Sequence, residues 1–282
     1  MRVTIFGATG LLGKVLMREW RDDEVVGLGS KDLDIRSPEQ VAAAIRLHQP
    51  EWLVLAAAYT DVDGCETHSQ LAFDVNCRGA ANVAQACAQE NVRLLFLSTD
   101  YVFDGTKRTP YEIDDPIAPQ TVYGKSKAAA EAEIRVTHPE ACILRTSWVF
   151  GVGGKCFPDT ILKLSETRTE LDVVNDQRSS PTYTVDLART IRQLCRKDAR
   201  GVLHATNRGD CTWFDFATEI VAGAQLTTRV RPTSSGKFVR PAKRPEYSVL
   251  SSQSLERHGL KMPTWQDALT RYLGERGLPT TP

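Results

Sequence analysis

The chain has 282 residues, of which 41% are hydrophobic and 25% are charged. Lys and Arg total 35, the same as Asp and Glu, so no net positive field attracts the chain to nucleic acid or to a membrane surface. The length suits one large domain or two modest ones with a sizeable core.

Composition and the start of the chain predict a cytoplasmic protein. Met1 is followed within two residues by an apolar strand, without a positively charged leader. The apolar run from Leu53 to Ala58 is far too short to cross a bilayer. The seven cysteines form no C-x-x-C pair and no metal-like spacing. We therefore expect reduced, mostly structural thiols and no bound metal.

Short apolar strands alternate with helices through the first half of the chain. Strands are expected at residues 3–6, 25–28, 52–57, 94–97 and 141–144, and helices at residues 11–20, 38–47, 69–89 and 122–136. Such alternation implies parallel pairing with both sheet faces covered. The predicted fold is α/β, a doubly wound (Rossmann) parallel sheet that binds ligands beyond the carboxyl ends of its strands.

The pattern loosens after Phe150. Helices are expected at residues 157–164, 184–195 and 213–222, a strand at 202–205, and irregular chain at 232–245. We assign residues 1–148 to a dinucleotide-binding domain, to which residues 183–205 return. Residues 149–282 then form most of a smaller, interleaved substrate-binding domain.

Three glycines, Gly7, Gly10 and Gly13, lie directly between the first strand and the first helix. Glycines at such a turn allow the backbone to approach a pyrophosphate, which binds at the helix N-terminus. A plain strand-to-helix turn is the alternative. The position of the motif, after a strand and before an amphipathic helix, favours a dinucleotide site.

The end of the second strand indicates which dinucleotide binds. The strand is followed by Gly29, Ser30 and Lys31, with no acidic residue before Asp32. A carboxylate there would bond the ribose 2′-hydroxyl of NADH, whereas a hydroxyl and an ammonium suit a 2′-phosphate. We expect NADPH, with NADH as the possible alternative.

Tyr123 and Lys127 are four residues apart on a predicted helix and therefore share one face. A nearby cation favours a phenolate, so we expect Lys127 to lower the pKa of Tyr123 and make it a proton donor near neutral pH. Thr99 follows the fourth strand, where its hydroxyl can bond a substrate carbonyl. A solvated helix face and a simple turn cap are the alternatives for these residues.

Together these features resemble the extended short-chain dehydrogenase/reductase superfamily, and within it the dTDP-4-dehydrorhamnose reductase family. The resemblance runs from residue 1 to about residue 272. The motifs that carry it are A-A-A-Y-T-D-V-D at 56–63, S-T-D-Y-V-F-D-G at 98–105, Y-G-K-S-K at 123–127, R-T-S-W at 145–148, N-D-Q at 175–177, P-T at 181–182 and R-P at 240–241.

The resemblance implies a role for each matching position. The catalytic residues would be Thr99, Tyr123 and Lys127. Contacts to the cofactor would come from Gly10, Leu11 and Leu12 at the pyrophosphate, Asp34 and Ile35 at the adenine, Ala58, Tyr59 and Thr60 beside the nicotinamide, Leu97 beneath it, and Lys127 at the ribose. Contacts to the sugar nucleotide would come from Thr99, Asp100 and Trp148, although a core tryptophan is the alternative for Trp148. Asn76 would support the active-site helix, with a plain exposed asparagine as the alternative.

The implied reaction is NADPH-dependent reduction of dTDP-4-dehydro-L-rhamnose to dTDP-L-rhamnose. Arg240, Lys243 and Arg244 are candidates to hold the substrate diphosphate. Lys14 and Val15 stand where some family members carry a carboxylate of a metal-bridged dimer, so no metal and no such dimer is carried over. A monomer or a homodimer is expected.

Two alternatives stay open. One is a 4-ketoreductase that acts on another dTDP-deoxyhexose, because the shared chemistry fixes Tyr123 and Lys127 and leaves the sugar undetermined. The other is a non-catalytic, NADP-binding regulatory subunit like the beta subunit of methionine adenosyltransferase. The motifs at residues 59–63 and 145–148 fit the reductases better.

Overall fold

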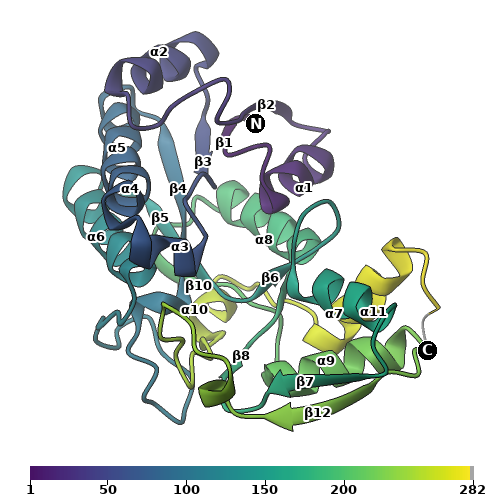
Figure 1. Ribbon diagram of the computed structural model, residues 1–282. Helices are drawn as coiled ribbons and strands as arrows, with labels where there is room; N and C mark the ends of the chain where they lie inside the picture. Colours follow the sequence, from purple (N-terminus) through teal and green to yellow (C-terminus); the bar gives the residue numbers. More distant parts are fainter. Residues whose placement is uncertain (280–282) are drawn as a thin grey trace.

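A six-stranded parallel sheet, with five strands from residues 1–148 and one from later in the chain, organises the computed structural model, which describes residues 1–279 (Figure 1). Its strands run in the order β10-β5-β4-β3-β1-β2. They are β1 (Arg2–Phe6), β2 (Glu24–Leu28), β3 (Trp52–Leu55), β4 (Arg93–Thr99), β5 (Cys142–Thr146) and β10 (Gly201–His204). The predicted α/β class and parallel sheet are confirmed.

Helices cover both faces of this sheet because its strands are apolar on both sides. Val3 and Val54 pack into one core cluster with α1 (Leu11–Glu19) and α8 (Thr184–Arg196). Phe6 and Leu53 pack into another with the helices of the opposite face. Those helices are α2 (Pro38–His48), α5 (Ala80–Gln89) and α6 (Val122–Thr137). The sheet therefore lies between two helical layers, with α2, α5 and α6 on one side and α1 and α8 on the other, as Figure 1 shows.

The region predicted as one helix over residues 69–89 is segmented. It contains α4 (Ser69–Phe73), a π-helical segment η1 (Asp74–Gly79) and α5, and it is preceded by α3 (Val62–Thr67). The π segment turns Asn76 inward, where its side chain makes three hydrogen bonds. Tertiary hydrogen bonding therefore replaces the regular helix at this point, as π segments do at many functional sites.

The second half adds a small layer beneath the sheet. It includes α7 (Phe157–Ser165), α9 (Trp213–Gly223), α11 (Trp265–Glu275), and the parallel pair β7 (Glu170–Val174) and β12 (Arg229–Thr233). The short elements are β6 (Val149–Phe150), β8 (Arg178–Ser179), β9 (Thr182–Tyr183), β11 (Cys211–Thr212), α10 (Gln253–Glu256) and the 3-10 helices η2 (Asp100–Val102) and η3 (Ser235–Lys237). The sequence did not predict β7, and it placed only the end of β12 within irregular chain.

The two halves share one apolar core. The cluster on the α1 face extends from Val3 in the first strand to Leu273 near the C-terminus. This continuity agrees with an interleaved second domain, and the boundary at residue 148 stays a prediction. Within residues 1–279, no helix is both long enough and apolar enough to span a membrane.

Candidate active site

The glycine turn brings the backbone of three segments close together. Gly7 has φ +91°, and a Cβ added there would lie 2.5 Å from the nitrogen of Ala57. A Cβ added at Gly13 would lie 2.1 Å from the carbonyl oxygen of Gly7. Within the described residues, no side chain caps the N-terminus of α1, so its first N–H groups are free to bind a pyrophosphate.

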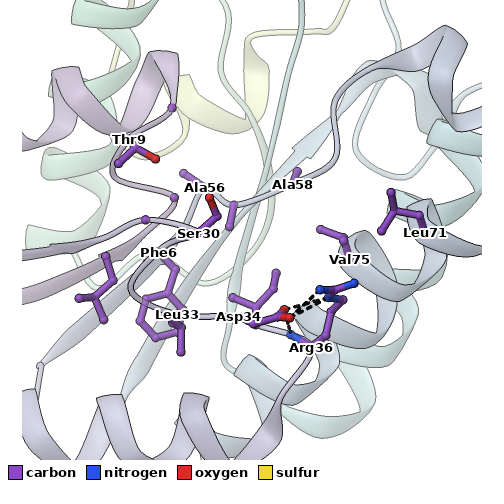
Figure 2. Close-up of a pocket in the computed structure, with 16 residues that line it drawn as sticks. Phe6, Thr9, Ser30, Leu33, Asp34, Arg36, Ala56, Ala58, Leu71 and Val75 are labelled. Atoms are coloured by element: carbon purple, nitrogen blue, oxygen red, sulfur yellow. Dashed lines mark hydrogen bonds and ion pairs between the residues drawn. The ribbon is translucent and has the colours of Figure 1, made fainter. Parts of the chain in front are cut away.

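A cavity of about 370 Å³ opens beside this turn, at the carboxyl ends of β1, β2 and β3 (Figure 2). Most of the expected adenosine-side residues line it. The lining includes Gly7, Thr9, Gly10, Ser30, Leu33, Asp34, Ile35, Arg36, Ala56, Ala57, Ala58, Leu71 and Val75. Leu11, Leu12 and Gly13 lie in the adjoining first turn of α1. The cavity therefore fits the nucleotide half of a dinucleotide.

The cation at this cavity is Arg36, which the sequence did not predict. Lys31, expected to face an adenosine phosphate, is exposed and does not line the cavity. Arg36 lines the cavity and forms an ion pair with Asp34 (Figure 2). Its Nε donates to Oδ1 at 2.9 Å and its Nη2 donates to Oδ2 at 2.6 Å. This ion pair holds the pKa of Asp34 below its usual range. Asp32 accepts from the backbone N–H of Gly29 at 2.8 Å and closes the turn after β2.

Asn76 connects the end of β3 to α6. Its Oδ1 accepts from the backbone N–H of Tyr59 at 2.7 Å, and its Nδ2 donates to the carbonyl of Tyr59 and to Oγ of Ser126, each at 3.0 Å. Ser126 in turn donates to the carbonyl of Tyr123 at 2.8 Å. The expected link between Asn76 and the active-site helix is present, and it fixes Tyr59 relative to Tyr123.

Tyr123 lies in the first turn of α6. The helix begins after Thr121, whose Oγ1 accepts from the backbone N–H of Gly124 at 3.0 Å. A Cβ added at Gly124 would lie 2.2 Å from the carbonyl oxygen of Tyr101, so η2 packs directly against this turn. The Tyr101 and Tyr123 rings meet edge to face, with centroids 5.7 Å apart.

The pKa of Tyr123 is raised, contrary to the prediction. Burial of the phenol is the largest cause, and a hydrogen bond with Thr99 opposes it in part. Lys127 is buried, whereas Tyr123 is partly exposed, and the Nζ of Lys127 donates to the carbonyl of Leu97 at 2.6 Å. Burial lowers the pKa of Lys127 to about 7, while Glu131 opposes this shift. An amine that holds its charge so weakly cannot offset the desolvation of Tyr123, so the expected lowering is wrong in this structure.

Asp100 faces the protein interior. Its Oδ1 accepts from Thr99 Oγ1 at 3.0 Å, and its Oδ2 accepts from Ser248 Oγ at 2.5 Å. Its side chain is buried, and burial raises the pKa of this carboxyl to about 6. Both oxygens of Asp100 bond protein groups, and the expected contact between Asp100 and a substrate stays a prediction. Asp100 orients the hydroxyl of Thr99.

Trp148 lies between β5 and β6 in a left-handed conformation, with φ +43°. Its ring stacks on Trp213, with centroids 3.4 Å apart and planes 8° apart. Trp213 and Phe157 line a second and larger cavity. Trp148 itself is not among the lining residues of that cavity. It packs behind Trp213 and against the core, and its contact with a sugar nucleotide stays a prediction.

The second cavity has a volume of about 950 Å³, and Tyr101 forms part of its lining. One wall is aromatic and another is basic. The basic side chains are Arg168, Arg231, Lys237, Arg240, Lys243 and Arg244. Arg240, Lys243 and Arg244 were predicted from the sequence. Arg168, Arg231 and Lys237 were not, nor were Phe157 and Trp213, because they come from segments that no motif connects. Among residues 1–279, no cluster of His, Cys, Asp and Glu could hold a metal ion.

Comparison with known proteins gives a consistent family. The family described as "RmlD substrate binding domain" matches residues 1–277. A dTDP-4-dehydrorhamnose reductase of Mycobacterium tuberculosis is 40% identical over 99% of this chain and 97% of its own length. A protein of Streptomyces antibioticus named "probable dTDP-4,6-dihydroxy-2-methyloxan-3-one 4-ketoreductase" is 40% identical over 95% of this chain and 93% of its own.

A solved structure agrees in both fold and sequence. The dTDP-4-dehydrorhamnose reductase of Bacillus anthracis, solved in complex with NADP, superposes with a TM-score of 0.95 and 38% identity. The match covers 97% of this chain and 99% of that one. These matches extend over nearly the whole chain, so it belongs to the dTDP-4-dehydrorhamnose reductase family.

Proposed function

We propose that this protein catalyses the NADPH-dependent reduction of dTDP-4-dehydro-L-rhamnose to dTDP-L-rhamnose. One observation carries the proposal. Tyr123 touches Tyr101, which lines the larger cavity, while Asn76 ties the helix of Tyr123 to Tyr59, next to the lining of the nucleotide cavity. A proton donor between a dinucleotide site and a sugar-nucleotide site is what ketone reduction requires.

The cofactor would be held mainly by backbone. Gly7, Gly10, Leu11, Leu12 and Gly13 would bind the pyrophosphate, Ser30, Asp34, Ile35 and Arg36 the adenosine side, and Ala58, Tyr59, Thr60, Leu97, Tyr123 and Lys127 the nicotinamide side. The close approach at Gly7 and Gly13 supports this assignment, because a side chain at either position would fill the turn. Bound NADPH supplies the hydride that C4 of the sugar receives.

Tyr123 supplies the proton. Its raised pKa keeps the phenol protonated at neutral pH, so the proton leaves only when the substrate oxygen becomes strongly basic during reduction. Thr99, oriented by Asp100, would bond the same oxygen and hold it in reach of the phenol. Lys127 would bond the ribose of the cofactor.

The larger cavity would take the dTDP-sugar. Trp148, through Trp213, would shape its aromatic wall, and the basic side chains would face the diphosphate. In this assignment residues 1–148 and 183–205 bind the cofactor, and most of residues 149–282 bind the substrate. A monomer or homodimer would suffice, because one chain contributes both cavities.

A related activity is the second candidate. The Streptomyces antibioticus relative is as similar in sequence as the Mycobacterium tuberculosis reductase, although its name gives a different keto sugar. The two activities share the roles of Tyr123, Thr99 and Lys127. They differ in the sugar that fits beside Tyr101.

The test is NADPH oxidation with dTDP-4-keto sugars made in situ from dTDP-glucose by the preceding enzymes. The proposal predicts turnover with dTDP-4-dehydro-L-rhamnose, and dTDP-L-rhamnose as the product identified by NMR. Preference for a different keto sugar would support the second candidate. Absence of turnover with every dTDP-4-keto sugar would favour a non-catalytic, NADP-binding subunit and overturn the proposal.

A further inference from the structure

One stretch of the chain, residues 235–245, forms a wall of the larger cavity and is named here the basic segment. It carries four basic residues and no acidic one. Every residue from Ser235 to Arg244 lines the cavity, yet only Ser235–Lys237 have regular structure, as η3. A segment with little hydrogen bonding of its own needs outside contacts to hold its charges in place.

Asp63 provides those contacts from the other half of the molecule. Its carboxylate accepts from Arg244 Nη1 at 2.5 Å and Nη2 at 2.9 Å, from Arg240 Nη1 at 3.2 Å, and from the backbone N–H of Ala242 at 3.2 Å. Asp63 lies in the first turn of α3, more than 170 residues away in sequence. The arginines hold the pKa of Asp63 down to about 2, so it stays ionised.

Arg244 has N–H groups that remain available for a ligand when it is paired with Asp63. A guanidinium has about five N–H donors, and three of those of Arg244 bond Asp63 or the carbonyl of Ala242. Its Nε and one N–H of Nη2 have no partner in the part of the chain that the structure describes. Asp63 does not line the cavity, whereas Arg240, Lys243 and Arg244 do. The carboxylate therefore lies behind the cations, and their remaining donors are available on the cavity side.

The same arginine is close to the catalytic end of the cavity. Arg244 and Tyr101 both line the larger cavity, and the Tyr101 ring meets that of Tyr123 edge to face. A ligand that binds Arg244 and reaches Tyr101 would be separated from the catalytic phenol of Tyr123 by one side chain. A sugar nucleotide fits this spacing, because its diphosphate immediately precedes the sugar that reacts.

We propose that Asp63 is a positioning residue that orients Arg240 and Arg244 to bind the diphosphate of a nucleoside diphosphate sugar. The inference rests on the proposed function for the identity of the sugar, and on the observed contacts for the role of Asp63. It assigns a common purpose to two motifs that lie far apart in the sequence, residues 59–63 and residues 240–241.

Removal of Asp63 can strengthen or weaken diphosphate binding, and the direction shows whether Asp63 acts by orienting the arginines or only through its charge. Asp63 is an anion next to an anion-binding surface, so its removal makes that surface more positive and by charge alone strengthens diphosphate binding. If Asp63 acts by orienting the arginines, its removal weakens binding instead. Asp63→Asn therefore gives opposite results under the two explanations.

The experiment measures dTDP binding by calorimetry, with NADP⁺ present, for the wild-type protein and for Asp63→Asn. We expect dTDP affinity to fall about tenfold, and the Michaelis constant for the keto sugar to rise in parallel. The kcat and the Michaelis constant for NADPH should stay within about twofold of wild type, because Asp63 touches neither Tyr123 nor the nucleotide cavity. Unchanged or tighter dTDP binding would overturn the inference.

Asp176→Asn is the matched control. Asp176 accepts from the backbone N–H of Ser235 at 2.9 Å and from its Oγ at 3.0 Å, so it holds the same segment from the other side without touching either arginine. This variant should bind dTDP nearly as well as wild type. An equal loss in both variants would show that general loosening of the segment, and not the orientation of the arginines, explains the effect.

Arg244→Met removes the other member of the Asp63–Arg244 ion pair. It keeps the inference testable if Asp63→Asn folds poorly. It should lose dTDP affinity by at least as much, and the double variant should lose little more than Arg244→Met alone. Additive losses would contradict positioning. If wild type binds dTDP and reduces no keto sugar, the proposed function fails, while the binding comparison still decides the role of Asp63.

Discussion

The two cavities of this protein are built in different ways. The nucleotide cavity lies at the ends of three adjacent strands and is bounded largely by backbone and short side chains such as Gly7, Ala57 and Ser30. The larger cavity is bounded by long aromatic and charged side chains, among them Trp213 and Arg240, from segments far apart in sequence. The first depends on strand geometry, and the second depends on ion pairs that hold irregular chain.

This difference predicts how each site fails. A cavity lined by backbone should be lost when a glycine of the turn is replaced by a residue with a side chain. It should tolerate the loss of a single charged side chain nearby. A cavity made of side chains is altered by the loss of one distant partner, as proposed for Asp63. The variants below test this contrast, from the largest expected effect to the smallest.

Tyr123→Phe should separate the two regions most completely, because Tyr123 lies where they meet. Turnover should fall by about 10²–10⁴-fold, the usual contribution of a general acid. NADPH binding should remain, because Phe keeps the ring that packs against Tyr101. Steady-state kinetics and a fluorescence titration with NADPH measure the two effects. Turnover near the wild-type rate would remove Tyr123 from the mechanism.

Gly13→Ala should damage the backbone-built cavity. The added Cβ would lie 2.1 Å from the carbonyl oxygen of Gly7, so the turn must move. We expect a loss of about 1–3 kcal/mol in the free energy of unfolding, together with weaker NADPH binding. Gly10→Ala is the control, because a Cβ there has its nearest neighbour at 3.3 Å and should cost less. Urea denaturation compares them, and equal losses would contradict the close-approach explanation.

Lys127 should make stability depend on pH. Burial lowers its pKa to about 7, whereas 10.5 is its ordinary value. Between these values the unfolded chain binds a proton that the folded protein does not, so the destabilising effect of burying this amine decreases as pH rises and disappears above pH 10.5. The unfolding free energy of wild type minus that of Lys127→Met should increase by up to about 1.4 kcal/mol per pH unit above pH 7. A flat or falling difference in urea denaturation would contradict the buried amine.

Arg36→Ala and Lys31→Ala should show how little single charges matter at the nucleotide cavity. Arg36 lines the cavity but is already paired with Asp34, so its loss should raise the Michaelis constant for NADPH by less than about tenfold. Lys31 is exposed outside the cavity, and its loss should change that constant by less than about twofold. A larger effect at Lys31 than at Arg36 would show that the loop after β2 adopts another arrangement when NADPH binds.

Local features of the site were predictable from the sequence. The glycine spacing, the alternation of strands and helices, and the shared face of Tyr123 and Lys127 each depend on residues within one or two elements. The resemblance to reductases supplied the order of the catalytic residues and the link from Asn76 to the active-site helix. The six-stranded sheet and the glycine turn have the predicted form.

Properties set by distant contacts were not predictable. The π segment around Asn76 depends on hydrogen bonds to Tyr59 and Ser126, which belong to other elements. The pairing of β7 with β12 joins two short, charged strands that are about 60 residues apart, so neither has a strong local pattern. The pKa of Tyr123 was predicted in the wrong direction, because burial is a property of the folded chain. The inward orientation of Asp100 depends on Ser248 for the same reason.

The most direct test of the central claim is transfer of a labelled hydride beside Tyr123. The reaction is run with NADPH that carries deuterium at both hydrogens of the nicotinamide C4, and the product is analysed by NMR. The account predicts dTDP-L-rhamnose with one deuterium at sugar C4, and almost no labelled product from Tyr123→Phe. Reduced sugar without deuterium at C4, or labelled product formed equally well by Tyr123→Phe, would contradict it.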